Sequence, residues 1–185
     1  MGSLTSTQKE VLVGSLLGDG TLRKQGSRTN ALLEVNHSYQ YKQYVDWKHS
    51  IFKEFVITSP KSRNGNGNRV AYRFTTKSIP VFTEFYKKFY IDGKKAIPKD
   101  LKLSAGILAV WFMDDGSRNR KSFYLNTQQF REQDQFFLAR KLVEDLGIES
   151  TLNRDRHYLR IRITNVGAIK MRKLIAPYIL PCFAY

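Results

Sequence analysis

Cysteine is nearly absent from this sequence, which holds one, Cys182, in 185 residues. A single cysteine can form neither an intrachain disulfide nor a cysteine-based zinc cluster, so the composition suits a reducing compartment. Long hydrophobic runs are also missing, because no apolar stretch approaches the roughly 20 residues of a membrane-spanning helix. We therefore expect an intracellular protein, in an organelle or a prokaryotic cytoplasm, with no membrane partner.

Acidic residues are scarce as well. The 16 Asp and Glu residues stand against 31 Lys and Arg residues, which gives a formal net charge of +15 and an isoelectric point near 10.0. Such a charge attracts polyanions, and nucleic acid is the first candidate partner. A basic structural protein of the ribosomal type is the alternative that charge alone leaves open.

Several nuclease and nucleotide-binding signatures are missing too. The three histidines, His37, His49 and His157, lie far apart in the sequence, whereas a ββα-metal nuclease needs a tight cluster of His and Asn. The sequence contains no P-loop, no Cys/His zinc spacing and no GxSxG serine motif. These classes of enzyme therefore fit poorly.

What the sequence does contain is one short motif in two copies. Residues 12–20 read Leu-Val-Gly-Ser-Leu-Leu-Gly-Asp-Gly, and residues 108–116 read Leu-Ala-Val-Trp-Phe-Met-Asp-Asp-Gly. Each copy predicts a short apolar helix that ends on an acid and a glycine. Gly14 and Gly18 share one helix face at i, i+4 spacing, which predicts a close approach by another helix.

The acids that end the two copies are candidate metal ligands. A carboxylate at a helix C-terminus faces the negative end of the helix dipole, so a cation between two such ends would be favourable. Asp19 and Asp115 would meet near a pseudo-twofold axis, and hard oxygen ligands suit Mg²⁺. Such a metal can activate water and stabilise a leaving oxygen. In register, Gly18 aligns with Asp114, so we expect Asp114 in the helix–helix seam or offering its backbone carbonyl.

The same order of elements follows each motif. Alternating and helical apolar spacings predict αββαββα twice, hence an α+β fold of two pseudo-symmetric halves whose antiparallel sheets form a saddle. A capping box is expected at Thr7 and Glu10, and a helix cap at Ser104. We predict an N-terminal half at 1–93, a linker at 94–103 and a C-terminal half at 104–185, with a break in structure over 92–98.

Several strands alternate sharply between apolar and polar residues. Val70, Tyr72 and Phe74 share one face of their strand, while Arg69 and Arg73 share the other, which predicts one face on the core and one face of cations. Arg, Gln, Asn and Glu are the side chains that read bases in the major groove, which a β-ribbon can enter. Solvated surface is an equally open interpretation for any single position. The outward residues that we predict to contact DNA are Arg23, Gln25, Glu34, Asn36, Arg69, Arg73, Ser122, Tyr124, Asn126, Tyr158, Arg160 and Arg162.

Residues 12–20 and 108–116 resemble the two motifs of the LAGLIDADG homing endonucleases, in the single-chain form with two halves. The segment Gly-Lys-Lys-Ala-Ile-Pro at 93–98, ahead of the second motif, is similar to the intron- or intein-associated members. The resemblance covers nearly the whole chain. It departs at Ser15 and Leu17, which replace the motif's Leu and first Asp, and at Val110, which replaces its glycine.

This resemblance implies a monomeric enzyme that cleaves double-stranded DNA with Mg²⁺, for which Mn²⁺ or Ca²⁺ substitutes in binding. It implies 3′ overhangs at a long, pseudo-palindromic target. Asp19 and Asp115 would be the metal-binding acids. Residues around them would complete the metal site, order water or stabilise charge: Gly18 and Asp114 at the metal, His37 and Gln128 at the strand ends, and Lys95, preferred over Lys94, from the linker. The second half shows no equally clear lysine.

Two other functions remain possible on the same fold. One is an RNA maturase, a splicing cofactor that binds intron RNA, and the other is a DNA-binding regulator that does not cleave. Loss of either motif acid would favour these alternatives, and both Asp19 and Asp115 are present.

Overall fold

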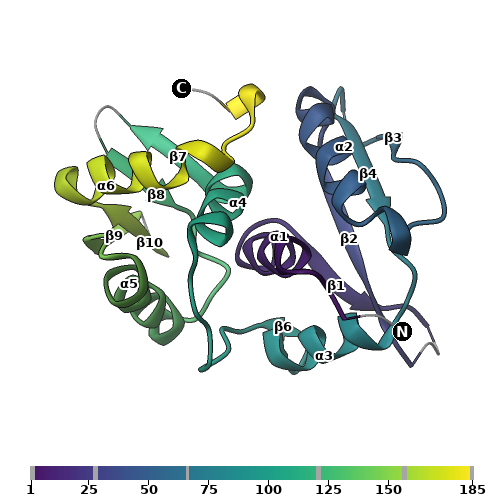
Figure 1. Ribbon diagram of the computed structural model, residues 1–185, viewed down its shortest axis with the longest axis horizontal. Coiled ribbons are helices and arrows are strands. Elements are labelled where there is room, and N and C mark those ends of the chain that lie inside the picture. Colours follow the sequence, from purple (N-terminus) through teal and green to yellow (C-terminus); the bar gives the residue numbers. More distant parts are fainter. Residues whose placement is uncertain (1–2, 27–28, 66, 120–121, 156–157, 184–185) are drawn as a thin grey trace.

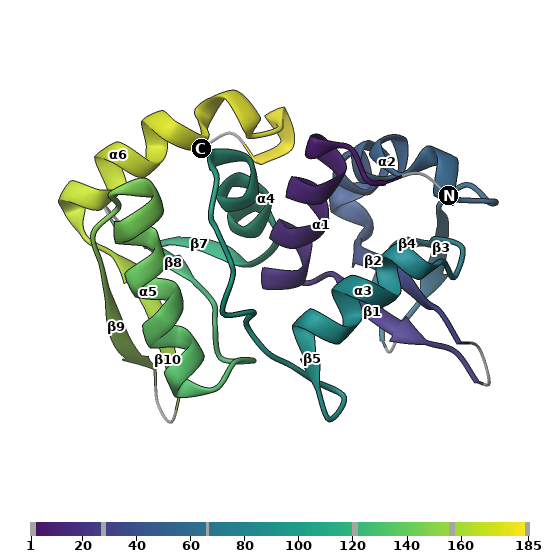
Figure 2. The ribbon, with the colours of Figure 1, turned by 60° about the horizontal axis from the view of Figure 1, so that its bottom comes forward.

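The computed structural model describes residues 3–26, 29–65, 67–119, 122–155 and 158–183 of the chain. Two helices lie side by side at its centre, α1 (Ser6–Leu17) and α4 (Ala105–Asp115), and a sheet with further helices lies on either side of them (Figures 1 and 2). Among these residues, no helix has the length and apolar character that crossing a membrane requires.

The first half is built on a four-stranded antiparallel sheet of order β1-β2-β4-β3. In the register of the central pair, His37 of β2 lies opposite Tyr72 of β4. Helix α2 and helix α3 contact this sheet. The elements are β1 (Thr21–Lys24), β2 (Ala31–Ser38), η1 (Tyr39–Tyr41), α2 (Lys42–Ile51), η2 (Lys53–Phe55), β3 (Lys61–Asn64), β4 (Val70–Thr75) and α3 (Pro80–Phe89).

The second half repeats this plan with the equivalent strand order β7-β8-β10-β9. Its elements are β7 (Gly116–Asn119), β8 (Ser122–Leu125), α5 (Glu132–Leu146), β9 (Ser150–Asp155), β10 (Tyr158–Ile163), α6 (Asn165–Ile175), η3 (Ala176–Tyr178) and η4 (Pro181–Phe183). The predicted order αββαββα is therefore confirmed in both halves, and the fold is α+β as expected.

The seam between α1 and α4 is apolar and very close. Leu12, Leu16 and Trp111 have no exposed surface. A Cβ added at Gly14 would lie 2.6 Å from the Cβ of Val110 and 2.7 Å from the carbonyl oxygen of Ile107. The glycine of one helix therefore makes room for the valine that replaces a glycine in the other, so the bulkier second copy is accommodated.

The first helix begins earlier than predicted. Thr5, not Thr7, caps it: the Thr5 hydroxyl accepts from the Gln8 N–H over 3.2 Å, and the Gln8 side chain accepts from the Thr5 N–H over 3.0 Å. Gln8 also donates to the carbonyl of Ile51 over 3.0 Å, which ties α1 to α2. The predicted partner Glu10 instead accepts a hydrogen bond from Ser104, which caps α4 as expected.

The predicted break between the halves is a tight hairpin. Strands β5 (Tyr90–Ile91) and β6 (Lys94–Lys95) pair across Asp92 and Gly93. Both turn residues have positive φ, 50° at Asp92 and 73° at Gly93, the geometry of the two-residue hairpin turn for which Asp-Gly is a preferred sequence. The expected domain boundary after residue 93 falls inside this hairpin.

The close seam makes a stability prediction. Gly14→Ala is expected to lower the free energy of unfolding by about 1–3 kcal/mol, because its methyl group meets Val110 and the Ile107 carbonyl. Val110→Gly removes the Val110 Cβ and Cγ1 that the new methyl group would meet, so only the contact with the Ile107 carbonyl remains. Urea unfolding of both single variants and the double variant should therefore show less than additive losses, and strictly additive losses would contradict this packing.

Candidate active site

The motif acids stand where the ends of α1 and α4 meet. Asp19 directly follows the cap residue of α1, and Asp115 is the last residue of α4. Burial raises the pKa of Asp115 to about 7, and the nearby charges of Asp19 and Asp114 add to the shift. Burial, followed by the charge of Asp114, also raises the pKa of Asp19. Three carboxylates therefore crowd one place, and a cation there would be favourable.

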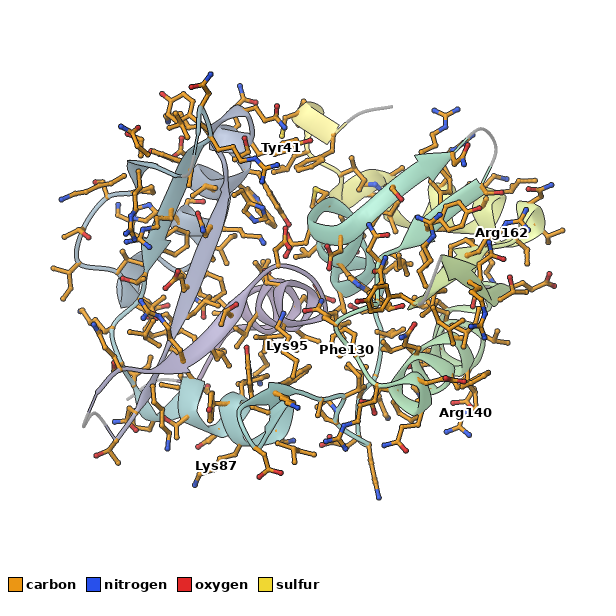
Figure 3. All side chains as sticks on the ribbon, turned by 180° about the vertical axis from the view of Figure 1, so that it is seen from behind. Tyr41, Lys87, Lys95, Phe130, Arg140 and Arg162 are labelled. Atoms are coloured by element: carbon orange, nitrogen blue, oxygen red, sulfur yellow. The ribbon has the colours of Figure 1, made fainter. Side chains whose placement is uncertain are left out.

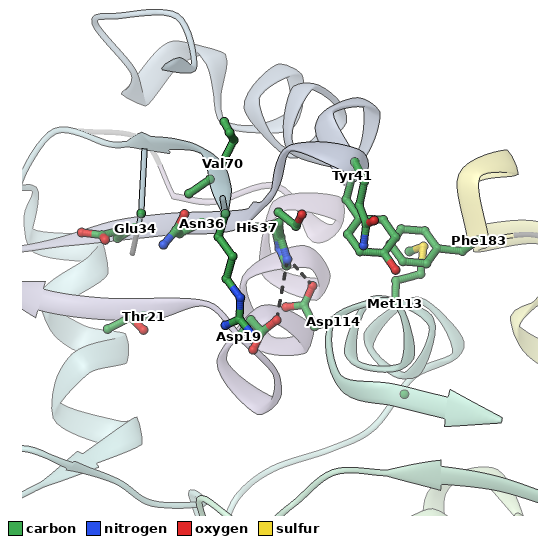
Figure 4. Close-up of a pocket in the computed structure, with 16 residues that line it drawn as sticks. Asp19, Thr21, Glu34, Asn36, His37, Tyr41, Val70, Met113, Asp114 and Phe183 are labelled. Carbon is green, nitrogen blue, oxygen red and sulfur yellow. Dashed lines mark ion pairs between the residues drawn. The ribbon is translucent and has the colours of Figure 1, made fainter. Parts of the chain in front are cut away.

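His37 lies between two of these acids at the end of β2 (Figure 4). Its Nδ1 is 3.6 Å from Asp19 Oδ2 and its Nε2 is 3.6 Å from Asp114 Oδ1, with 7% of the side chain exposed. Burial and the charge of Lys48 lower the pKa of His37 to about 4. The imidazole is therefore neutral at pH 7.

Lys95 reaches the acids from the β5–β6 hairpin and lies beneath α1 in Figure 3. Its Nζ donates to the carbonyl oxygen of Gly18 over 2.6 Å. Burial lowers its pKa to about 8, although the charges of three aspartates oppose that shift. Its neighbour Lys94 is exposed, so of the two linker lysines Lys95 is the one that lies at this centre.

In the second half, Gln129 contacts the acids, one position after the expected Gln128. The Nε2 of Gln129 lies 3.2 Å from Asp115 Oδ2 and 3.3 Å from the Gly18 carbonyl oxygen. Strand β8 ends at Leu125, so the alternation of a strand cannot assign residues 128 and 129. His37, by contrast, still belongs to its strand β2.

Asp114 lies in the seam, one of the two positions that its register predicts. A Cβ at Gly18 would be 2.3 Å from the Cβ of Asp114, so the glycine makes room for this side chain. Asp114 Oδ1 accepts from Lys48 Nζ and from the Tyr44 hydroxyl, each over 2.7 Å. Burial lowers the pKa of Lys48, and the charge of Asp114 opposes that shift.

Sequence reasoning missed Lys48 and Tyr44. Tyr44 lies on the buried face of α2. Lys48 follows one turn later on the same face, and it has no exposed surface. A charged residue on the apolar face of a helix was the signal that could have identified a buried polar contact.

Three of the six predicted DNA-contacting residues of the first half line one groove. Glu34, Asn36 and Arg69 border a groove of about 1090 Å³ that also holds Asp19 and His37 (Figure 4). Two arginines balance the charge of Glu34, whose carboxylate lies 2.7 Å from Arg23 and 3.7 Å from Arg73. Gln25 is exposed beyond the end of β1.

The second half differs from the prediction at two positions. Ser122 and Tyr124 were expected on an exposed strand face, but both are buried, with 8% of each exposed. The guanidinium of Arg162 donates to the Ser122 hydroxyl over 3.1 Å, and that of Arg160 stacks 4.2 Å from the Tyr124 ring. The two arginines of β10 therefore cover β8. Tyr158 is exposed and Asn126 is half-buried.

The chain is similar to known proteins over most of its length. Residues 9–170 match the model of the LAGLIDADG DNA endonuclease family. The chain is 30% identical to the probable intron-encoded endonuclease 1 of Wickerhamomyces canadensis, covering 99% of this chain and 84% of that protein. It is 31% identical to the cytochrome b mRNA maturase bI2 of Debaryomyces hansenii, covering 95% and 71%. It is 32% identical to the RecA protein of Mycobacterium gastri, covering 98% of this chain and only 47% of that protein.

Solved structures show the same fold. The homing endonuclease I-WcaI bound to its DNA recognition sequence superposes with a TM-score of 0.91 at 28% identity, covering 98% of this chain and 85% of that one. The structure of I-DmoI in complex with DNA and Mn has a TM-score of 0.64 at 16% identity, covering 95% and 99%.

The shifted pKa values predict how stability without metal depends on pH. Between pH 4 and 6.5 folded Asp115 keeps a proton that the unfolded chain loses. The contribution of Asp115 to the free energy of unfolding therefore falls as the pH rises. In the same window the unfolded chain holds a proton on His37 that the folded protein does not, so stability rises and the two effects offset each other. Asp115→Asn removes the first of these two effects. The free energy of unfolding of this variant should therefore increase with pH more steeply than that of the intact protein, by up to about 1.4 kcal/mol per pH unit.

Urea unfolding from pH 4 to 7 with a chelator measures this difference. The exposed Glu84→Gln serves as the matched control and should leave the slope unchanged. Identical slopes for Asp115→Asn and the intact chain would show that Asp115 is not held protonated in the fold.

Proposed function

This chain belongs to the LAGLIDADG DNA endonuclease family, and we propose that it is a homing endonuclease that cleaves both strands of a specific DNA duplex. The observation that carries the proposal is the meeting of Asp19 and Asp115 at the ends of two packed helices, between two sheets with basic side chains. We further propose a long, pseudo-palindromic target and 3′ overhangs. The endonuclease relative and the DNA-bound I-WcaI structure support this assignment.

We propose that DNA lies across the two sheets, which together form a saddle. A net charge of +15 provides the general attraction to the phosphates. The groove residues Glu34, Asn36 and Arg69 are suited to base contacts in the major groove. Both halves are contributed by one chain, so a monomer suffices.

The residues present fit a divalent metal of the Mg²⁺ type. Asp19 and Asp115 offer hard oxygen ligands, and the carbonyls of Gly18 and Asp114 lie beside them in sequence. In the described part of the chain no three His, Cys, Asp or Glu side chains form a ready-made metal site. A site with so few protein ligands is suited to Mg²⁺, because this ion binds through one or two carboxylates together with water and substrate phosphates. I-DmoI was crystallised with DNA and Mn, which supports a divalent metal.

The chain's own groups have separable roles in phosphodiester hydrolysis. When bound, the metal would activate water and stabilise the leaving oxygen. Neutral His37 can orient that water through Nδ1, which lies 3.6 Å from Asp19, while its Nε2 faces the buried Asp114 carboxylate. Lys95, held at the Gly18 carbonyl beside the acids, would stabilise negative charge on a substrate phosphate, and the amide of Gln129 donates to the Asp115 carboxylate.

We propose that the reading frame lies within an intron or an intein. The endonuclease relative is named as intron-encoded. The chain spans about half of the RecA protein that it matches. The proposed location is an organelle or a prokaryotic cytoplasm.

An RNA maturase is the second candidate function. The chain is 31% identical to a cytochrome b mRNA maturase. This identity is almost the same as that to the endonuclease relative. The presence of both motif acids favours cleavage, since binding RNA does not require a metal site. No observation favours a regulator that binds DNA without cutting it.

Cleavage of a selected duplex tests the proposed function. Duplexes chosen from a random library by binding in Ca²⁺ should be cut on both strands when Mg²⁺ is added. Asp19→Asn and Asp115→Asn should bind within a few-fold of the intact chain but cleave about 10³-fold more slowly or not at all, because each removes a metal ligand. Glu84→Gln should cleave normally.

The alternatives give different results in the same experiment. A chain that binds its duplex tightly and never cuts it is not an endonuclease. Binding to intron RNA with stimulation of splicing, and no duplex cleavage, would establish the maturase instead.

The two linker lysines provide a sharper comparison. Lys95→Met should slow single-turnover cleavage by about 10- to 100-fold, because it removes the buried cation beside the acids. The exposed Lys94→Met is the matched control and should cleave within a few-fold of the intact chain. Equal effects of the two changes would mean that neither lysine has a specific place at the centre.

A further inference from the structure

A buried polar cluster lies beside the α1–α4 seam. Lys48 Nζ and the Tyr44 hydroxyl both donate to Asp114 Oδ1 over 2.7 Å, and the Lys48 ammonium lies 4.4 Å from the centre of the Tyr44 ring. The side chains of Lys48 and Asp114 have no exposed surface, and neither has Tyr44. Lys48 and Tyr44 belong to α2, which packs against β2 and β4 of the first sheet.

An ion pair in this position does little for stability by itself. The cost of removing both ions from water is comparable with the attraction between them. What the pair does provide is a fixed geometry between the halves, because Lys48 is on α2 of the first half and Asp114 is on α4 of the second. A second contact across the seam comes from the Tyr44 hydroxyl, 3.3 Å from the Val110 carbonyl oxygen.

The cluster exists on one side of the pseudo-twofold axis. The residue of α1 that corresponds to Asp114 is Gly18, which has no side chain to receive a lysine. The Gly18 carbonyl instead accepts from Lys95 and Gln129, over 2.6 and 3.3 Å. The two acids of the metal site therefore have different supports.

The cluster also contacts the His37 ring. The imidazole Nε2 is 3.6 Å from the same Asp114 oxygen that Lys48 and Tyr44 hold. The ring lies 5.1 Å from the Tyr44 ring, and its other nitrogen faces Asp19. A shift of the Asp114 carboxylate would therefore move His37 against Asp19.

We propose that Lys48 and Tyr44 are positioning residues, which hold Asp114 and through it orient His37 at the Asp19 side of the active site. The inference rests on the proposed function and extends it. On the other side of the pseudo-twofold axis Gly18 stands in the place of Asp114 and has no side chain to hold. The loss of the cluster should therefore slow the cutting of one DNA strand more than that of the other.

A double substitution separates positioning from folding. Lys48→Met alone would leave the Asp114 charge buried without a partner and is expected to destabilise the fold. Lys48→Met combined with Asp114→Asn removes both charges while keeping the shapes of the side chains and an acceptor for the Tyr44 hydroxyl. The exposed Lys53→Met, just after α2, is the matched control.

Single-turnover cleavage with each strand labelled separately gives the main measurement. The double variant should bind the selected duplex in Ca²⁺ as the intact chain does, yet cut one strand about 10- to 100-fold more slowly while the other strand changes by a few-fold. Equal slowing of both strands in proportion to lost thermal stability would overturn the inference, and so would unchanged cleavage. Lys53→Met should leave both rates unchanged.

A spectroscopic measurement stands apart from cleavage. The ¹⁵N chemical shifts of the His37 ring, recorded at one pH without metal or DNA, should differ between the intact chain and the double variant and not change in Lys53→Met. If the intact chain cuts no duplex, the proposed function fails while this signature still tests the positioning. Unchanged His37 shifts in the double variant would overturn the inference whatever the cleavage result.

Discussion

The close contact between α1 and α4 is the constraint on which the rest of the molecule depends. Because Gly14 and Gly18 have no Cβ, the two helices approach until Val110 and Asp114 fill the space that a side chain would take. Helix α4 is followed at once by β7, and three residues join α1 to β1, so the seam fixes how the two sheets face one another. It also brings the acid at each helix end to one place.

The meeting of these acids is electrostatically unfavourable, and nearby lysines offset part of the cost. Three aspartates meet in a partly buried region, and burial and mutual repulsion raise the pKa values of Asp19 and Asp115. Lys48 compensates the carboxylate that is fully buried, and Lys95 lies against the carbonyl next to Asp19. A carboxylate pair that is short of positive charge is a favourable site for a divalent metal, which is the basis of the proposed chemistry.

The features predicted from the sequence are those that local pattern determines. Apolar periodicity fixes the order of helices and strands, and Asp19 and Asp115 follow from their places in a repeated motif. The errors concern contacts between distant segments. Ser122 and Tyr124 are covered by arginines of a neighbouring strand, and the partner of Asp114 lies 66 positions away on another helix. Gln129, which contacts Asp115, was not singled out because the chain has already left strand β8 at this point.

The seam also explains why the active centre is not symmetric. Gly18 and Asp114 are equivalent positions of the two motifs, and a Cβ at the first would stand 2.3 Å from the Cβ of the second. Side chains at both positions would collide, so a carboxylate on one helix requires glycine on the other. A duplicated motif in one chain can meet this requirement, because each copy changes independently, whereas two identical chains could not. The packing that joins the halves therefore also makes them chemically different.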